Sequence, residues 1–183
     1  MPLSAAPVSR TLKHTRSVSF EGYARADGLW DIEGHITDTK PDNYQLASGM
    51  HPAGHPVHQM RVRLTIDRRF NVIAAEASTD AMPFPPHCAA VTPQYAQLAG
   101  LNLARGFRRA VLERFGELRG CTHITELLLQ FPTAAIQTLA GEAPEDDGSK
   151  PFQLDRCHAL DTGGEAVRLY FPLWRRKVKT GTD

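Results

Sequence analysis

The chain has 183 residues, 42% of them hydrophobic and 22% charged, so it is long enough to fold around one core without disulfides. Its 21 Lys and Arg nearly balance 20 Asp and Glu, which argues against nucleic acid and anionic membranes as partners. No apolar run reaches the roughly 20 residues that span a bilayer, and the N-terminal residues lack the apolar core of a signal peptide. We therefore expect a cytoplasmic protein. The sequence leaves open whether the protein forms a homo-oligomer.

The first half of the chain predicts an antiparallel sheet. Two extended stretches between Ser17 and Lys40 flank Asp27-Gly28, a dipeptide typical of hairpin turns. A loop rich in Pro, Gly and His follows, from Pro41 to Val57. The run from Met60 to Asp67 then alternates apolar and polar residues with the period of a half-buried strand. Another extended segment, Phe70–Thr79, ends before a proline cluster.

The middle of the chain predicts helices. Thr92-Pro93 is the expected pairing of an N-cap and a first helical position, and Gly100 is a candidate break. An apolar stripe at helical spacing runs from Leu103 to Phe115. A second helix is predicted from Thr122 to Gly141, with a kink or break at Pro132.

The C-terminal part predicts an acidic solvated loop and then two extended segments, Phe152–Leu160 and Val167–Trp174, that form a hairpin. The predicted fold is α+β: a mainly antiparallel sheet of three or four strands, two or three helices packed on one face, and this hairpin extending the sheet. We expect a flexible N-terminal segment over residues 1–15, a single domain over 16–175, and a basic tail over 176–183.

Candidate chemistry lies in the cysteines and histidines. The three cysteines are too few for a disulfide framework and are available as reduced thiols. Cys88 and Cys121 each precede a predicted helix, where a thiolate is favoured. If the two helices pack against one end of the sheet, Cys88, Cys121 and His58 converge, with His123 as a further ligand. Thiolate and imidazole favour Zn²⁺ or iron over Ca²⁺ or Mg²⁺.

These residues also have a structural interpretation. Free cysteines in a cytoplasmic protein are commonly small buried hydrophobes, which is the alternative for Cys88 and Cys121 and the favoured interpretation for Cys157. Arg25, Arg63 and Lys40 are candidate ligands for a substrate carboxylate. The alternative for these charged residues is pairing with neighbouring carboxylates across the strands.

Several segments together resemble a known family. They are the run from Arg25 to Gly34 (RADGLWDIEG), Asp38-Thr39-Lys40, His58-x-Met60 leading into Arg63–Asp67, and the run from Gly120 to Leu128 (GCTHITELL). These segments are similar to the bacterial domain of unknown function family 2889, over roughly residues 10 to 175. That resemblance indicates membership and leaves the function open.

The order of sheet, cysteine and helix is also similar to iron–sulfur cluster scaffolds of the NifU/IscU type. That resemblance places His58 where the scaffolds have an Asp, and Cys88 and Cys121 where they have their second and third cysteines. The sequence departs from the scaffolds twice, because His51 or His55 stands where a cysteine is expected and Gly120 where a His is expected. A mononuclear Zn or Fe site is compatible with these departures.

The candidate ligands and the resemblances are compatible with two functions. The first is a metal-binding lyase or hydrolase that acts on a small organic acid. The second is a non-catalytic scaffold or accessory module whose metal or thiol passes to a partner. The standard dinucleotide, P-loop, zincin and α/β-hydrolase motifs do not occur in the sequence.

Overall fold

The structure is a computed structural model that describes residues 2–141, 150, 151 and 153–176. The chain divides into two compact units, Met1–Ala143 and Pro144–Asp183. The prediction of one domain over residues 16–175 stays a prediction, because this division does not test whether the second unit folds alone. Among the described residues, no helix has the length and apolar character to cross a membrane.

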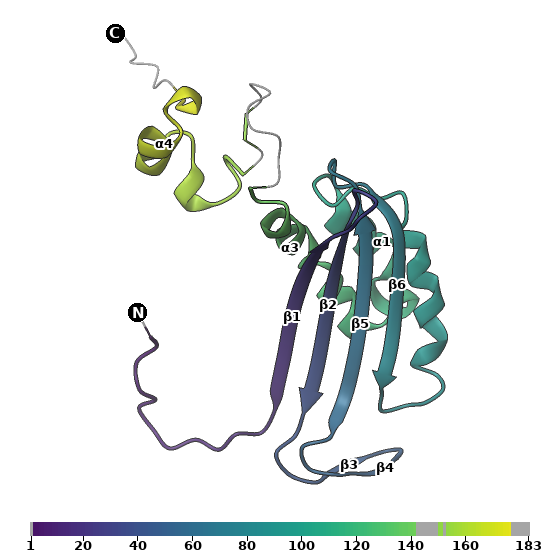
Figure 1. The fold of residues 1–183 in the computed structure, drawn as a ribbon. Helices are drawn as coiled ribbons and strands as arrows, with labels where there is room; N and C mark the ends of the chain where they lie inside the picture. The colour runs from purple at the N-terminus through teal and green to yellow at the C-terminus, as the bar shows by residue number, and fades with distance from the viewer. Residues whose placement is uncertain (1, 142–149, 152, 177–183) are drawn as a thin grey trace. The chain divides into compact units, whose positions relative to one another are not determined.

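The first unit is built on a four-stranded antiparallel sheet, as the sequence predicts (Figure 1). The strands lie in the order β1-β2-β5-β6. Their bounds are Thr15–Ala24 for β1, Trp30–Thr39 for β2, Pro56–Ile66 for β5 and Val72–Ala81 for β6. The predicted Asp27-Gly28 turn joins β1 to β2, and Gly28 has the positive φ, 81°, that such a turn requires.

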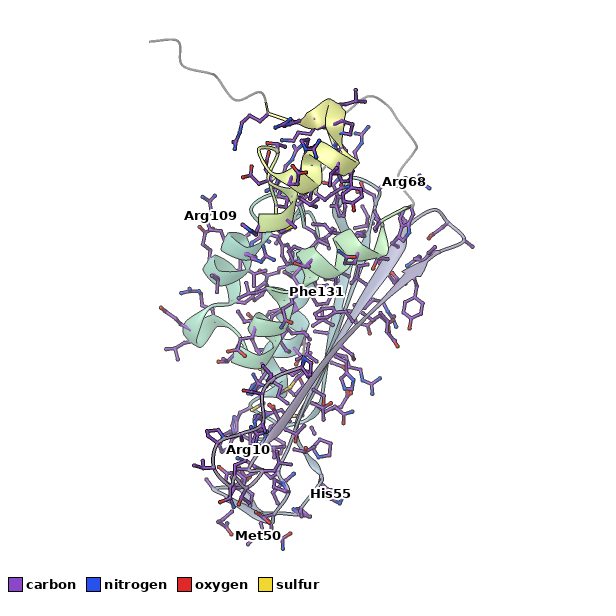
Figure 2. The ribbon with its side chains drawn as sticks, turned by 90° about the vertical axis from the view of Figure 1, so that its left-hand side faces the viewer. Arg10, Met50, His55, Arg68, Arg109 and Phe131 are labelled. Atoms are coloured by element: carbon purple, nitrogen blue, oxygen red, sulfur yellow. The ribbon has the colours of Figure 1, made fainter. Side chains whose placement is uncertain are left out.

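One face of the sheet is buried, because the apolar residues of β2 and β5 alternate with polar ones. Ile32, Ile36, Met60 and Leu64 are each at most 1% exposed. The helices of the first unit cover this face (Figure 1). Figure 2 shows Phe131 between the helices and the sheet, and its ring packs edge to face on Phe20 of β1, with ring centroids 5.1 Å apart. The fold class is therefore α+β.

The helical layer follows the predicted segments with shifted ends. Its elements are the 3₁₀ helix η1 (Ala89–Leu98), α1 (Phe107–Phe115), η2 (Glu117–Arg119), α2 (Thr122–Leu128) and α3 (Phe131–Thr138). η1 starts three residues before the predicted N-cap Thr92, directly after Cys88. Pro132 lies in the first turn of α3, so the predicted break is confirmed and separates α2 from α3.

The segment from Pro41 to Val57, predicted as a loop, contains a small hairpin. Strands β3 (Tyr44–Leu46) and β4 (Gly49–His51) form a two-stranded sheet of their own. Met50 and His55 lie at one end of the first unit, beyond the end of the large sheet (Figure 2). Strands of three residues are too short to leave a periodic signal in the sequence.

The predicted C-terminal hairpin is wrong. The described part of the second unit contains no strand and instead holds η3 (His158–Leu160), α4 (Glu165–Tyr170) and η4 (Pro172–Trp174). Local interactions favour the turns and the helix: the Asp155 carboxylate accepts hydrogen bonds from the backbone and hydroxyl of Thr162, and Glu165 pairs with Arg168 one turn along α4. The acidic stretch 142–149 and the tail beyond Arg176 lie outside the described residues.

A candidate metal site at the end of the sheet

Asp38, near the end of β2, is a buried carboxylate. The alternation that buries Ile32 and Ile36 also directs Asp38 to the buried face, where it is 3% exposed. A carboxylate removed from water in this way needs charged or hydrogen-bonding partners. Its position at the end of an apolar stripe is therefore the first sign of a functional site.

Residues of β1 and of the segment before it bind the Asp38 carboxylate. Arg16, the cross-strand neighbour of Asp38, donates from Nε to Oδ1 at 2.8 Å and from Nη2 to Oδ2 at 2.9 Å. His14, which lies in the predicted flexible segment, donates from Nε2 to Oδ1 at 2.8 Å. Burial opposes ionisation of Asp38, but the hydrogen bonds from Arg16 and His14 outweigh it and lower its pKa to about 2.

Two further histidines reach the other carboxylate oxygen, Oδ2. His58 of β5 is the cross-strand neighbour of Asp38 and places Nδ1 at 3.2 Å. His123, in the first turn of α2, places Nε2 at 3.4 Å. The two rings stack with their centroids 3.8 Å apart. A strand and a helix far apart in the sequence thus meet at one oxygen atom.

Both imidazoles favour the neutral form. Burial lowers the pKa of His58, and the charge of a protonated His123 would lower it further. Burial also lowers the pKa of His123, with a second contribution from the Arg16 guanidinium. A neutral imidazole has the free lone pair that metal binding requires, whereas an imidazolium has none.

The three side chains can hold a metal ion. One ligand atom from each of Asp38, His58 and His123 lies within 4.8 Å of the other two. Two atoms that each bind zinc at about 2.1 Å in tetrahedral geometry lie roughly 3.4 Å apart, close to the separations of 3.2 and 3.4 Å from Oδ2. His14 and Nε of Arg16 donate to the other oxygen, Oδ1, and Nη2 of Arg16 donates to Oδ2 itself, so outer partners fix the carboxylate.

Two cavities meet at this site and share His58, His123, Pro83 and Phe84. The first has a volume of about 490 Å³. It is lined by those four residues and by His14, Arg16, Asp38, Lys40, Tyr44, Leu46 and Val57. The second has a volume of about 310 Å³, and sulfur-containing side chains are among its lining residues. It is lined by the shared four and by Met60, His87, Cys88, Val91, Gly120, Cys121 and Thr122.

The four predicted metal ligands Cys88, Cys121, His58 and His123 all line the second cavity. Both cysteines directly precede a helix, as expected. Among the described residues, however, the group whose ligand atoms converge contains the two histidines and Asp38, and neither cysteine belongs to it. Cys121 Sγ lies 3.9 Å from Nδ1 of His123. Ligation by the cysteines stays a prediction. Cys157 is an exposed free thiol, so its interpretation as a small buried hydrophobe is wrong.

The three predicted substrate ligands lie in different places. Lys40 lines the larger cavity beside Asp38. Arg25 pairs with Asp27 and Asp31, with shortest distances of 2.7 and 3.1 Å. Arg63 pairs with Glu33 at 2.7 Å on the face of the sheet away from the helices. Neither Arg25 nor Arg63 lines a cavity at the Asp38 site. Their role in substrate binding stays a prediction.

Sequence reasoning missed Asp38, Arg16 and His14 as parts of the site. A signal for Asp38 was present, because it continues the apolar positions Ile32 and Ile36 at the same period of two. A charged residue at such a position indicates a buried charge. The contributions of Arg16 and His14 depend on the pairing register of β1 with β2, which the sequence does not display.

Comparison with known proteins gives one match. The family described as "protein of unknown function (DUF2889)" matches residues 14–137, a range that contains every side chain around Asp38. No curated protein and no solved structure matches the chain. The resemblance to iron–sulfur scaffolds therefore stays unconfirmed. Because the match covers more than half of the sequence, the chain belongs to the DUF2889 family.

Proposed function

We propose that this member of the DUF2889 family binds a zinc or iron ion through Asp38, His58 and His123. The convergence of an ionised carboxylate and two neutral imidazoles on one small volume carries the proposal. Imidazole nitrogen favours zinc and iron, whereas Mg²⁺ and Ca²⁺ prefer sites made wholly of oxygen. The outer hydrogen bonds from Arg16 and His14 support it, because they fix the carboxylate without occupying either imidazole.

The number of protein ligands favours catalysis over a structural role. Structural zinc sites use four protein ligands, whereas catalytic sites use three and leave a position open for water or substrate. Two histidines and one carboxylate also form the common set for catalytic iron(II). At the open position a metal supplies Lewis acidity toward a carbonyl or a bound water. This chemistry fits a lyase or hydrolase.

Lys40 supports an organic acid as the substrate. Its ammonium group lies over the Tyr44 ring, 5.1 Å from the centroid, and Lys40 lines the larger cavity beside the three proposed ligands. No ion pair joins it to a carboxylate within the described part of the chain. The charge of the site therefore favours a small anion over a neutral or cationic substrate.

The test is elemental analysis of the protein purified without a histidine tag, loaded with zinc or with iron(II) and then desalted. We expect about one ion per chain in the wild type and none in the double variant His58→Ala/His123→Ala. The matched control is His35→Ala, which removes a histidine from the opposite face of β2. Metal-free wild type, or equal metal in the double variant with unchanged circular dichroism, would overturn the proposal.

A further inference from the structure

The lining of the larger cavity divides by chemistry. Its charged and polar lining residues are His14, Arg16, Asp38, Lys40, His58 and His123. The other five are largely hydrophobic: Tyr44, Leu46, Val57, Pro83 and Phe84. Phe84 and Tyr44 are 49% and 41% exposed, although both are large hydrophobic side chains. Exposed apolar side chains gathered beside a few convergent polar groups are typical of small-molecule sites.

We infer that the ligand of this cavity is a carboxylic acid with a branched or aromatic hydrocarbon body. This inference rests on the proposed function and specifies its substrate. The carboxylate binds at Lys40, and the charge of Asp38 in the same cavity is already balanced by Arg16. The hydrocarbon body packs on Tyr44 and Phe84, which lose their exposure to water.

The size of the cavity sets a limit on this ligand. At about 490 Å³ it falls in the range of sites that enclose a small organic molecule. An acetate-sized acid would leave the hydrophobic lining in contact with water, whereas an acid with a larger hydrocarbon body would cover it. The apolar walls therefore select against the smallest acids, and Lys40 selects against uncharged molecules of the same shape.

Binding of three probes tests the inference. Phenylacetate has both a carboxylate and an aromatic hydrocarbon body. Acetate has only the carboxylate, and 2-phenylethanol has only the aromatic body. We expect calorimetry on zinc-loaded protein to show phenylacetate binding at least about ten-fold more tightly than either of the others. Lys40→Gln and Phe84→Ala should each weaken phenylacetate binding by about ten-fold. Arg109→Gln, at an exposed position of α1 outside both cavities, should leave it unchanged.

The outcomes separate this inference from the proposed function. Equal affinity for phenylacetate and acetate, equal affinity for phenylacetate and the alcohol, or no binding of phenylacetate would each overturn the inference. Zinc content is measured on the same samples. A protein that binds zinc without preferring phenylacetate retains the proposed function and loses only the substrate assignment.

A separate observation concerns Cys121. Its Sγ lies 3.9 Å from Nδ1 of His123, while Nε2 of the same ring faces Asp38. When Nε2 holds an ion, the ring proton resides on Nδ1 and needs an acceptor. Cys121 supplies that acceptor from the adjoining cavity. We propose that Cys121 is a positioning residue, which fixes the tautomer and orientation of His123 without binding the metal itself.

Zinc affinity, measured by competition with a chromophoric chelator, tests this role. Cys121→Ala should weaken zinc binding by about 10- to 100-fold, the usual cost of losing an outer partner of a metal ligand. Cys121→Ser keeps an acceptor and should restore most of the affinity. Cys157→Ser, at an exposed thiol outside this cavity, is the control and should bind as the wild type does.

The cobalt(II) form distinguishes an outer partner from a ligand. The wild type should show no charge-transfer absorption from sulfur to cobalt. Such a band, if lost in Cys121→Ser, would show that the thiolate is a ligand and would overturn the positioning role. Wild-type affinity in Cys121→Ala would overturn it as well. If the wild type itself binds no metal, the proposed function is overturned, and the positioning role of Cys121 is overturned with it.

Discussion

Replacement of Arg16 by Leu tests whether the Asp38 carboxylate is held ionised in the metal-free protein. The variant removes both guanidinium hydrogen bonds to Asp38, together with the one to Glu126, and keeps an apolar side chain as far as Cδ. The pKa of Asp38 falls from an ordinary value of 3.8 to about 2 in the folded protein. At 1.36 kcal/mol per unit, this shift contributes about 2 kcal/mol of stability at neutral pH, chiefly through Arg16 and His14.

The expected cost of Arg16→Leu is about 2 kcal/mol at pH 7. Loss of one partner from a buried ion pair commonly costs about 3–5 kcal/mol, but His14, His58 and His123 still surround this carboxylate. Because the folded pKa of Asp38 is depressed, its stabilisation is present above pH 4 and is lost as pH falls toward 2. The difference between the variant and the wild type should therefore shrink over that interval.

Urea unfolding of EDTA-treated protein, followed by the fluorescence of buried Trp30, measures this difference at several pH values. Arg63→Leu is the matched control, since its pair with Glu33 is largely exposed and should be worth about 0.2–1 kcal/mol. A loss below about 0.5 kcal/mol for Arg16→Leu, or a loss that stays constant from pH 7 to pH 3, would refute the reasoning.

Three further predictions concern packing and metal. Gly34→Ala should cost about 1–3 kcal/mol in urea unfolding, because the new Cβ would lie 2.8 Å from the Phe131 ring; an unchanged midpoint would contradict this packing. Leu127→Ala, in the core, should lower the free energy of unfolding by about 2–5 kcal/mol. Leu118→Ala, at a fully exposed position, should change it by no more than about 0.5 kcal/mol. Equal effects of the two substitutions would contradict the described core. Zinc at 100 times its dissociation constant should stabilise the wild type by about 2.7 kcal/mol and leave His58→Ala/His123→Ala unaffected. Equal thermal shifts in both proteins would place the zinc elsewhere.

The sheet could be predicted from the sequence because its strands carry long alternating patterns. β2 and β5 are ten and eleven residues long, with the apolar positions of each on one face. The break between α2 and α3 was predictable for a local reason, the presence of Pro132. In short segments, the apolar periodicity does not distinguish a helix from a strand. The six residues of α4 complete fewer than two helical turns, so their helical period is indistinguishable from an extended one.

The site was only partly predictable for a related reason. The positions of Cys121 and His123 at the start of a helix follow from local signals around Gly120 and Thr122. Local signals do not identify Asp38 as the carboxylate on which the histidines converge, because Asp38 meets His123 only through the packing of α2 on the end of the sheet. The sequence predicted two cysteines and two histidines as ligands, and the converging group contains both histidines together with Asp38.

The most direct test of the central claim is anomalous diffraction from crystals of the protein grown with zinc. We predict a single peak within bonding distance of Oδ2 of Asp38, Nδ1 of His58 and Nε2 of His123. A peak between the sulfur atoms of Cys88 and Cys121, or no peak at Asp38 in fully loaded crystals, would contradict it.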